Sequence, residues 1–213
     1  MLEIRETNSG LIIAIKVIPN ARTTEIVGLI GESGSGKTIA AKSLIGLLPS
    51  RIRVTEGTAM FRGTDLFTLS PKAIRRIRGK DISVIPQDAL HALNPVHRIG
   101  RQVGEPLSIH TDRSGSAIRA MGLKYLAKVK IDNPRLRARQ YPHQFSGGMQ
   151  QRALTAMSLS TEPSLIIADE PTTALDVTIQ AQIIALLKDL RDETEASFLF
   201  ISHDLGLVST LCD

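Results

Sequence analysis

The sequence predicts an α/β fold in which short buried strands alternate with helices around a mostly parallel sheet. Short apolar runs, several of them rich in β-branched residues, recur along the 213-residue chain. The stretches between them carry apolar residues at three- and four-residue steps, which is the spacing of an amphipathic helix. Because parallel strands are buried on both faces by their connecting helices, the two patterns together indicate this fold class.

Each expected element follows from its own residues. Strands are expected at residues 25–30, 82–85, 165–168 and 198–201. Helices are expected at residues 38–48, 115–131 and 179–192, the last of which buries Ile183, Ile184, Leu186, Leu187 and Leu190. Residues 88–160 contain few strand signals and many Arg and Lys, so we expect a helical subdomain there. The chain would then be a single domain, with a core made of residues 1–87 and 161–213.

Composition excludes several classes of function. Aromatic residues amount to 3% of the chain, and none precedes Phe61, so a platform that stacks nucleic-acid bases is not expected. The single cysteine, Cys212, permits no internal disulfide and favours a reducing compartment. No apolar run approaches the ~20 residues that cross a bilayer. The start of the chain, with Glu3 and Glu6, also differs from a signal peptide.

The net charge of +5 is unevenly distributed along the chain. Residues 61–155 hold 17 Lys and Arg against 6 Asp and Glu, whereas residues 156–213 hold 2 against 10. The basic block is suited to contact with an anion, a nucleic acid or an anionic membrane. An ordinary solvated helical surface explains it equally well, and the sequence leaves both interpretations open.

The strongest local signal is Gly31-Glu-Ser-Gly-Ser-Gly36-Lys37-Thr38, which lies between an expected strand and an expected helix. Glycines let successive N–H groups point at phosphate oxygens, and the helix presents its positive N-terminal end. Lys37 can bring a full charge to the terminal phosphates, and the Thr38 hydroxyl can ligate Mg²⁺. The predicted phosphate-binding residues are Gly31, Ser33, Gly34, Ser35, Gly36, Lys37 and Thr38.

Polar residues also follow three other expected strands. Asp169 is placed to hold Mg²⁺ through water, and Glu170 to polarise an attacking water as a general base. His203 is placed to hydrogen-bond a terminal phosphate or the attacking water, and Gln87 to touch Mg²⁺ or that water. Each of them alone also fits a solvated or structural loop position. The phosphate-binding segment favours the catalytic interpretation.

The segment Phe145-Ser146-Gly147-Gly148-Met149-Gln150-Gln151-Arg152 resembles the signature sequence of ABC-type ATPases. The other motifs of that family occur in order between Gly31 and His203. They are the phosphate loop at 31–38, the Q-loop Gln87, the pair Asp169-Glu170, the D-loop Ala174-Leu175-Asp176 and the switch histidine His203. The resemblance implies a P-loop NTPase (RecA-like) core with a small N-terminal antiparallel β part and a helical subdomain. It also implies ATP and Mg²⁺ as cofactors and adds Asp176 to the nucleotide-binding residues.

Residues 87–95 and 145–152 look like those of importer ATPases for dipeptides, oligopeptides and nickel. The resemblance implies an ATP-hydrolysing subunit that powers such an importer from the cytoplasmic face of the inner membrane. Two nucleotide-binding domains would face head to tail, so that Ser146, Gly147 and Gly148 of one act on ATP held by the other. The other implied partners are transmembrane permease subunits and, indirectly, a solute-binding protein. No nucleic-acid partner is expected.

Two features depart from the family pattern. The family stacks adenine on an aromatic residue upstream of the phosphate loop, and here an aliphatic residue such as Ile13 or Val17 is the expected substitute. We therefore expect weaker or less base-selective nucleotide binding. Residues 11–24 look short and irregular for the family's N-terminal sheet. The chain also stops ten residues after His203, where the importer group continues, so a C-terminal truncation is expected.

Two other interpretations of the same motifs stay open. One is a non-transport ABC ATPase that acts on DNA or ribosomes. Long coiled-coil repair ATPases need hundreds of residues between phosphate loop and signature, whereas Lys37 and Ser146 are 109 apart, and ribosome-acting members usually carry two such domains. The other interpretation is a truncated domain that binds nucleotide without turnover.

Overall fold

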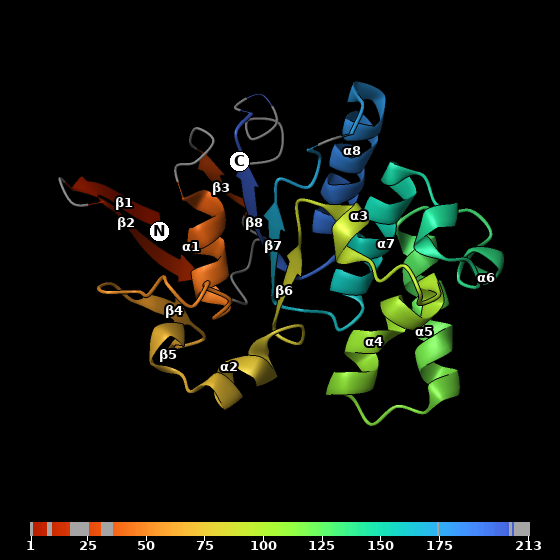
Figure 1. The fold of residues 1–213 in the computed structure, drawn as a ribbon, viewed down its shortest axis with the longest axis horizontal. Coiled ribbons are helices and arrows are strands. Elements are labelled where there is room, and N and C mark those ends of the chain that lie inside the picture. Colours follow the sequence, from red (N-terminus) through yellow and green to blue (C-terminus); the bar gives the residue numbers. More distant parts are fainter. Residues whose placement is uncertain are drawn as a thin grey trace.

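The computed structural model describes residues 2–7, 10–17, 26–30, 36–173, 175–204 and 206. Its main sheet has four parallel strands in the order β3-β8-β7-β6 (Figure 1). These strands are β3 (Ile26–Ile30), β8 (Ser197–Ser202), β7 (Leu165–Asp169) and β6 (Ile82–Ile85). The parallel sheet is confirmed, and the expected strand ends are shifted by one residue at most.

The carboxyl ends of the four strands lie at one edge of the sheet. Ile30 pairs with Ser202, and Asp169 pairs with Ile201, so β3, β7 and β8 end nearly level. The last residue of β6 lies opposite Ala168 of β7. The segments that leave this edge carry the start of α1, Gln87, Glu170 and His203, and this is the edge where parallel sheets bind ligands.

A smaller sheet has the order β1-β2-β4-β5. Its strands are β1 (Leu2–Thr7), β2 (Gly10–Val17), β4 (Ala59–Phe61) and β5 (Thr64–Asp65). Pairing is antiparallel within β1–β2 and β4–β5, but parallel where β2 meets β4. The expectation of a short, irregular segment is wrong for residues 11–17, because β2 pairs with β1 without a gap from Gly10 to Ile15. Residues 18–24 lie outside the described residues.

Helix α1 (Lys37–Leu44) follows β3 and ends before the expected position, Leu48. Gly46 has φ +63°, a left-handed conformation that glycine adopts without steric cost. The Leu47 N–H donates to the Lys42 carbonyl at 2.8 Å, which is the closing bond of a Schellman motif. The glycine therefore ends this helix earlier than the apolar pattern predicts.

The elements described between residues 89 and 159 are all helical. They are α3 (Ala89–Ala92), α4 (Ile99–His110), α5 (Gly115–Lys128), α6 (Pro134–Arg137), the 3₁₀ turn η2 (Pro142–Gln144) and α7 (Gly147–Leu159). Helix α5 stops short of the expected residue 131, because Lys130 turns into the left-handed region at φ +58°. The remaining elements are η1 (Leu66–Thr68), α2 (Pro71–Ile77) and α8 (Val177–Glu193). In the described part of the chain, none of the helices combines the length and apolar character that crossing a bilayer requires.

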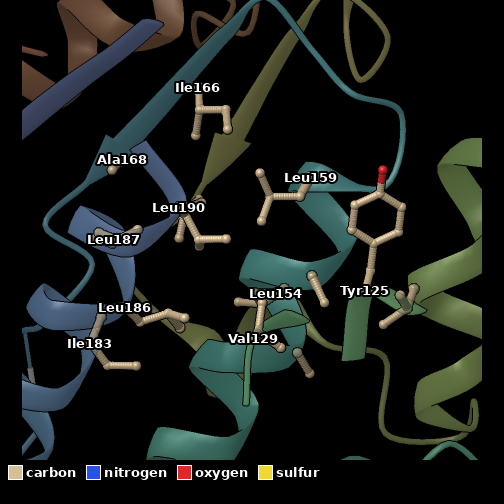
Figure 2. Packing of buried hydrophobic residues seen from close by; sticks show 14 of the residues in the cluster. Tyr125, Val129, Leu154, Leu159, Ile166, Ala168, Ile183, Leu186, Leu187 and Leu190 are labelled. Carbon is tan, nitrogen blue, oxygen red and sulfur yellow. The ribbon is translucent and has the colours of Figure 1, made fainter. Parts of the chain in front are cut away.

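The main sheet separates two apolar clusters. Along β7, Leu165 and Ile167 belong to the cluster that includes residues of α1 and α2, while Ile166 and Ala168 belong to the other. Alternate strand residues point to opposite faces, so both faces of the sheet are covered as predicted. Figure 2 shows the second cluster, in which α5, α7 and α8 meet β7. The five residues expected to bury one side of α8 are all buried in it.

Candidate functional site

The start of α1 supplies the described part of the predicted phosphate loop. Gly36 has φ +86° and precedes the helix without any side-chain cap, and the first helical turn contains no acidic residue. The exposed N–H groups of such a turn, with the helix dipole, favour an anion. Lys37 is buried, with 6% of its surface exposed. Gly31, Ser33, Gly34 and Ser35 lie outside the described residues.

Thr38 and Asp169 meet at the end of β7. The Thr38 hydroxyl donates to Asp169 Oδ1 at 3.0 Å. Burial raises the pKa of the Asp169 carboxyl, and the nearby Glu170 adds to this rise. The Thr38 hydrogen bond and the charges of Lys42 and Lys37 act in the opposite direction. A buried carboxylate that costs free energy to ionise gains from a divalent cation beside it.

The donor set fits Mg²⁺ bound together with phosphates. Among the described residues, no group of three or more His, Cys, Asp or Glu side chains is placed to hold a metal by itself. One hydroxyl and one carboxylate in contact are instead the partial shell that Mg²⁺ completes with water and substrate phosphates. Gln87, the third expected metal contact, does not hydrogen-bond to either of them but to Glu170.

Glu170 gathers the predicted catalytic residues around one carboxylate. Gln87 Nε2 donates to its Oε2 at 2.9 Å, and His203 Nδ1 lies 3.3 Å from its Oε1. Thr173 Oγ1 also donates to Oε2 at 2.9 Å. The Glu170 side chain is 13% exposed and that of His203 52%, so the carboxylate is largely enclosed and the imidazole faces solvent. Oε2 is therefore held by two donors, while Oε1 lies on the side of the exposed histidine.

The backbone of Glu170 contributes to this placement. Its φ of +45° is in the left-handed region, which non-glycine residues seldom adopt. Its N–H still donates to the Ile201 carbonyl of β8 at 2.9 Å, which ties Glu170 to the end of the sheet. Asp169 therefore contacts Thr38, whereas its neighbour Glu170 contacts Gln87 and His203. The arrangement keeps apart the two carboxylates that the sequence assigns to Mg²⁺ and to the attacking water.

Thr173 is a site residue that the sequence interpretation missed. It lies three residues after Glu170, and its N–H also donates to the Glu170 carbonyl at 3.1 Å. The sequence Glu-Pro-Thr-Thr after an expected strand could have indicated this contact. A threonine at the fourth position of a turn can hydrogen-bond back to the residue at the first position.

The signature segment begins a helix away from the Glu170 group. The Ser146 hydroxyl accepts from the Met149 N–H at 3.4 Å and caps α7. Gln150 Nε2 donates to the Pro142 carbonyl at 2.9 Å, which fixes the preceding turn. In the part of the chain described, no hydrogen bond joins Ser146 to Thr38, Asp169 or Glu170. Ser146 and Gly147 are exposed.

The packing of two helices explains why residue 148 is a glycine, and the sequence interpretation did not include this explanation. A Cβ placed on it would lie 2.7 Å from Ile179 Cγ2 of α8, so a glycine here lets the two helices approach. A Cβ on Gly147 would meet Leu175 Cδ2 at an ordinary 3.4 Å. Asp176 caps α8 by accepting from the Ile179 N–H at 2.9 Å. The signature and D-loop segments are thus neighbours within one chain.

Comparison with known proteins identifies relatives over most of the chain. The model of the ABC transporter family matches residues 19–173. The dipeptide transport ATP-binding protein DppD of Bacillus subtilis is 50% identical over 190 residues, which are 89% of this chain and 57% of that protein. A putative peptide import ATP-binding protein of Brucella abortus is 48% identical, with the same two coverages. The chain therefore spans a little over half the length of these relatives.

A solved structure of an ATP-binding cassette is also similar to this chain over nearly its whole length. A dimeric, post-hydrolysis form of the ATP-binding cassette MJ0796, bound to ADP and Pi, superposes with a TM-score of 0.76 and 28% identity. The alignment covers 98% of this chain and 88% of that one.

Proposed function

Because this chain belongs to the ABC transporter family, we propose that it is the ATP-binding and ATP-hydrolysing subunit of a peptide importer. The observation that carries the proposal is the group around Glu170, in which Gln87 and Thr173 hold one carboxylate oxygen and His203 lies beside the other. The relatives' names favour peptides over nickel as cargo.

The proposed ATP site uses both sides of the strand edge. Lys37, Gly36 and residues 31–35 of the predicted loop hold the phosphates, and Thr38 and Asp169 hold Mg²⁺. When bound, the metal neutralises developing phosphate charge. Glu170 orients the attacking water and accepts its proton, while His203 hydrogen-bonds the γ-phosphate or that water. Gln87 keeps the carboxylate in place through its 2.9 Å bond.

The second half of the site comes from another nucleotide-binding domain in this proposal. Ser146, Gly147 and Asp176 are exposed at the starts of α7 and α8, with Gly148 beneath them. Helix starts suit contact with an anionic phosphate. The dimeric state of the similar cassette supports a pair of domains. In our proposal the two domains face head to tail, so that these residues reach the partner's ATP.

We further propose permease subunits as membrane partners on the cytoplasmic face of the inner membrane, and a solute-binding protein as an indirect one. An apolar groove of about 380 Å³ beside β6 supports the proposed contact with permease subunits. Its lining includes Pro86 before Gln87, Ala92 of α3 and Pro106 of α4, and it also reaches Ala41 of α1 and Asp169. In the proposed division, residues 88–160 form a helical subdomain on a core of residues 1–87 and 161–213.

Single-turnover hydrolysis of ATP tests the enzymatic part. Removing the proposed base in Glu170→Gln should slow hydrolysis by about 10²–10⁴-fold while ATP still binds. Glu105→Gln is the matched control, because Glu105 is exposed on α4 away from the site. A rate that rises with the square of protein concentration supports the pair of domains. Absence of hydrolysis by the unaltered chain at every concentration would favour the nucleotide-binding, non-catalytic alternative instead.

A further inference from the structure

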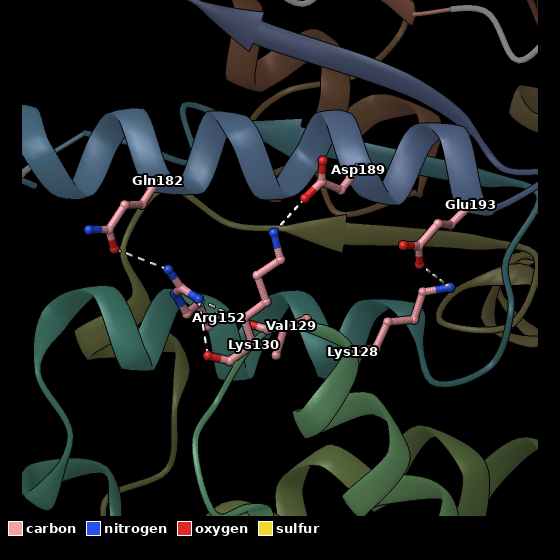
Figure 3. A network of polar contacts seen from close by, with 7 residues as sticks. All are labelled: Lys128, Val129, Lys130, Arg152, Gln182, Asp189 and Glu193. Atoms are coloured by element: carbon pink, nitrogen blue, oxygen red, sulfur yellow. Dashed lines mark hydrogen bonds and ion pairs between the residues drawn. The ribbon is translucent and has the colours of Figure 1, made fainter.

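Part of the basic block is neutralised within the chain. Lys130 Nζ lies 2.5 Å from Asp189, and Lys128 Nζ lies 3.5 Å from Glu193. Figure 3 shows these contacts, which join the end of α5 to α8. Arg152 Nη2 donates to Gln182 at 3.1 Å. Asp189 and Glu193 of α8 thus take up some of the positive charge of the basic block.

Another part of the basic block surrounds a hollow between α4, α5 and α6. The hollow has a volume of about 640 Å³. Its arginines are all exposed, and they are Arg98, Arg101, Arg119, Arg135 and Arg139. Within the described residues, none of their guanidinium groups makes an ion pair or a hydrogen bond, and Arg98 alone has a ring contact, 5.9 Å from the centroid of Tyr141. No Asp or Glu of the described chain lines the hollow.

Small residues make the floor of the hollow. Gly104 of α4 lies so close to α5 that a Cβ on it would be 2.7 Å from Ile118 Cγ2. Gly100 is equally close to Ala138, where a Cβ would lie 2.8 Å from the methyl carbon. The close approach of the helices leaves a mostly apolar surface between the guanidinium groups, to which Ser108 adds the one hydroxyl side chain in the described lining.

We propose that this hollow binds an amphiphilic phosphate, with the phosphate on the arginine rim and an apolar chain on the floor. Guanidinium groups match phosphate oxygens with paired N–H donors and are weakly hydrated, so they bind such groups well at a surface. A nucleotide fits the lining less well, because the described lining contains no aromatic side chain to stack a base. The same chemistry is found in a soluble alkyl phosphate and in an anionic phospholipid.

Isothermal titration of the full chain with decyl phosphate tests the site. Inorganic phosphate and decanol are titrated separately, since each carries one half of the proposed ligand. The site variant is Arg119→Gln with Arg135→Gln. The matched control is Lys72→Gln with Arg76→Gln, which removes the same charge from exposed positions of α2. Basal ATP hydrolysis of both pairs is measured, because none of these residues belongs to the proposed ATP site.

We expect decyl phosphate to bind more tightly than either half-ligand, with an affinity reduced about tenfold or more in the site variant and unchanged in the control. Sedimentation with phosphatidylglycerol vesicles, against phosphatidylcholine vesicles, distinguishes the sources. Binding to the anionic vesicles that the site variant loses indicates a bilayer lipid, and binding of decyl phosphate alone indicates a soluble ligand. Equal losses in both double variants, or equal binding of inorganic phosphate and decyl phosphate, would overturn the proposal. If the hollow does not bind decyl phosphate, ATP hydrolysis is unaffected. This outcome can therefore be distinguished from failure of the proposed function.

Discussion

The contact between α7 and α8 makes Gly148→Ala an informative variant. The added Cβ would lie 2.7 Å from Ile179 Cγ2, roughly 1 Å inside ordinary carbon–carbon contact. Ile179 is β-branched and sits in the first turn of α8, so its side chain has one strongly preferred rotamer and yields little. Gly147 provides the comparison, because its added Cβ would make only an ordinary 3.4 Å contact with Leu175.

The size of the effect follows from two opposing contributions. Forcing a methyl group into a well-packed contact costs about 1–3 kcal/mol. Alanine in place of glycine returns roughly 0.5–1 kcal/mol in a helix. We therefore expect Gly148→Ala to lower the free energy of unfolding by about 0–2.5 kcal/mol. Gly147→Ala should leave it unchanged or raise it by less than about 1 kcal/mol.

Urea unfolding followed by far-UV circular dichroism measures both variants, since the chain contains no tryptophan. Working without nucleotide keeps any loss of ATP binding out of the measurement. Shortening the opposing side chain in Gly148→Ala/Ile179→Ala should relieve the clash, which gives a coupling energy of about 0.5–3 kcal/mol in the double-mutant cycle. Equal midpoints for the two single glycine variants, or strictly additive effects in the cycle, would refute the argument.

Three further predictions concern the pKa values of two buried groups and the selectivity of nucleotide binding for adenine. Burial raises the pKa of Asp169, so its ionisation costs folded-state stability as pH rises above the unfolded value of about 3.9. Without Mg²⁺ and nucleotide, Asp169→Asn should therefore be more stable than the parent chain near neutral pH by urea midpoint, an advantage that disappears toward pH 4. Burial and the 2.8 Å bond to Glu162 raise the pKa of Tyr125. Tyr125→Phe should cost about 1 kcal/mol of stability and remove the later step of an alkaline tyrosinate titration. Finally, calorimetric affinities for ATP and GTP should differ by less than about tenfold, or 1.4 kcal/mol, and a larger ATP preference would count against an aliphatic adenine contact.

The strands of the main sheet and helix α8 could be predicted because their residues carry their own signal. The run from Leu165 to Ala168 is buried on both faces, and no polar residue interrupts it. In α8 the three- and four-residue spacing from Ile183 to Leu190 matches the helical period, so its buried side follows from the order of residues alone. The strands β4 and β5 had no such signal, since they are three and two residues long.

The contacts of the site depend on the order of the strands, which no local pattern contains. Gln87 and Glu170 are 83 residues apart and meet because β6 and β7 are neighbours in the sheet. The end of α1 was missed for a different reason, because Gly46 lies inside an apolar stretch and its left-handed backbone outweighs the helical spacing. Gly148 was assigned to nucleotide contact alone, since its distance to Ile179 requires the packed helices.

The two apolar clusters on either side of β7 have a consequence for how the chain unfolds. β7 is hydrogen-bonded to β6 on one side and to β8 on the other, and its alternate side chains are shared between the clusters. Neither cluster can open without exposing half of the strand's apolar surface to water. The helices after residue 88 and the layer around α1 are therefore expected to lose structure in one cooperative step, with the amide protons of β7 among the slowest to exchange with deuterium.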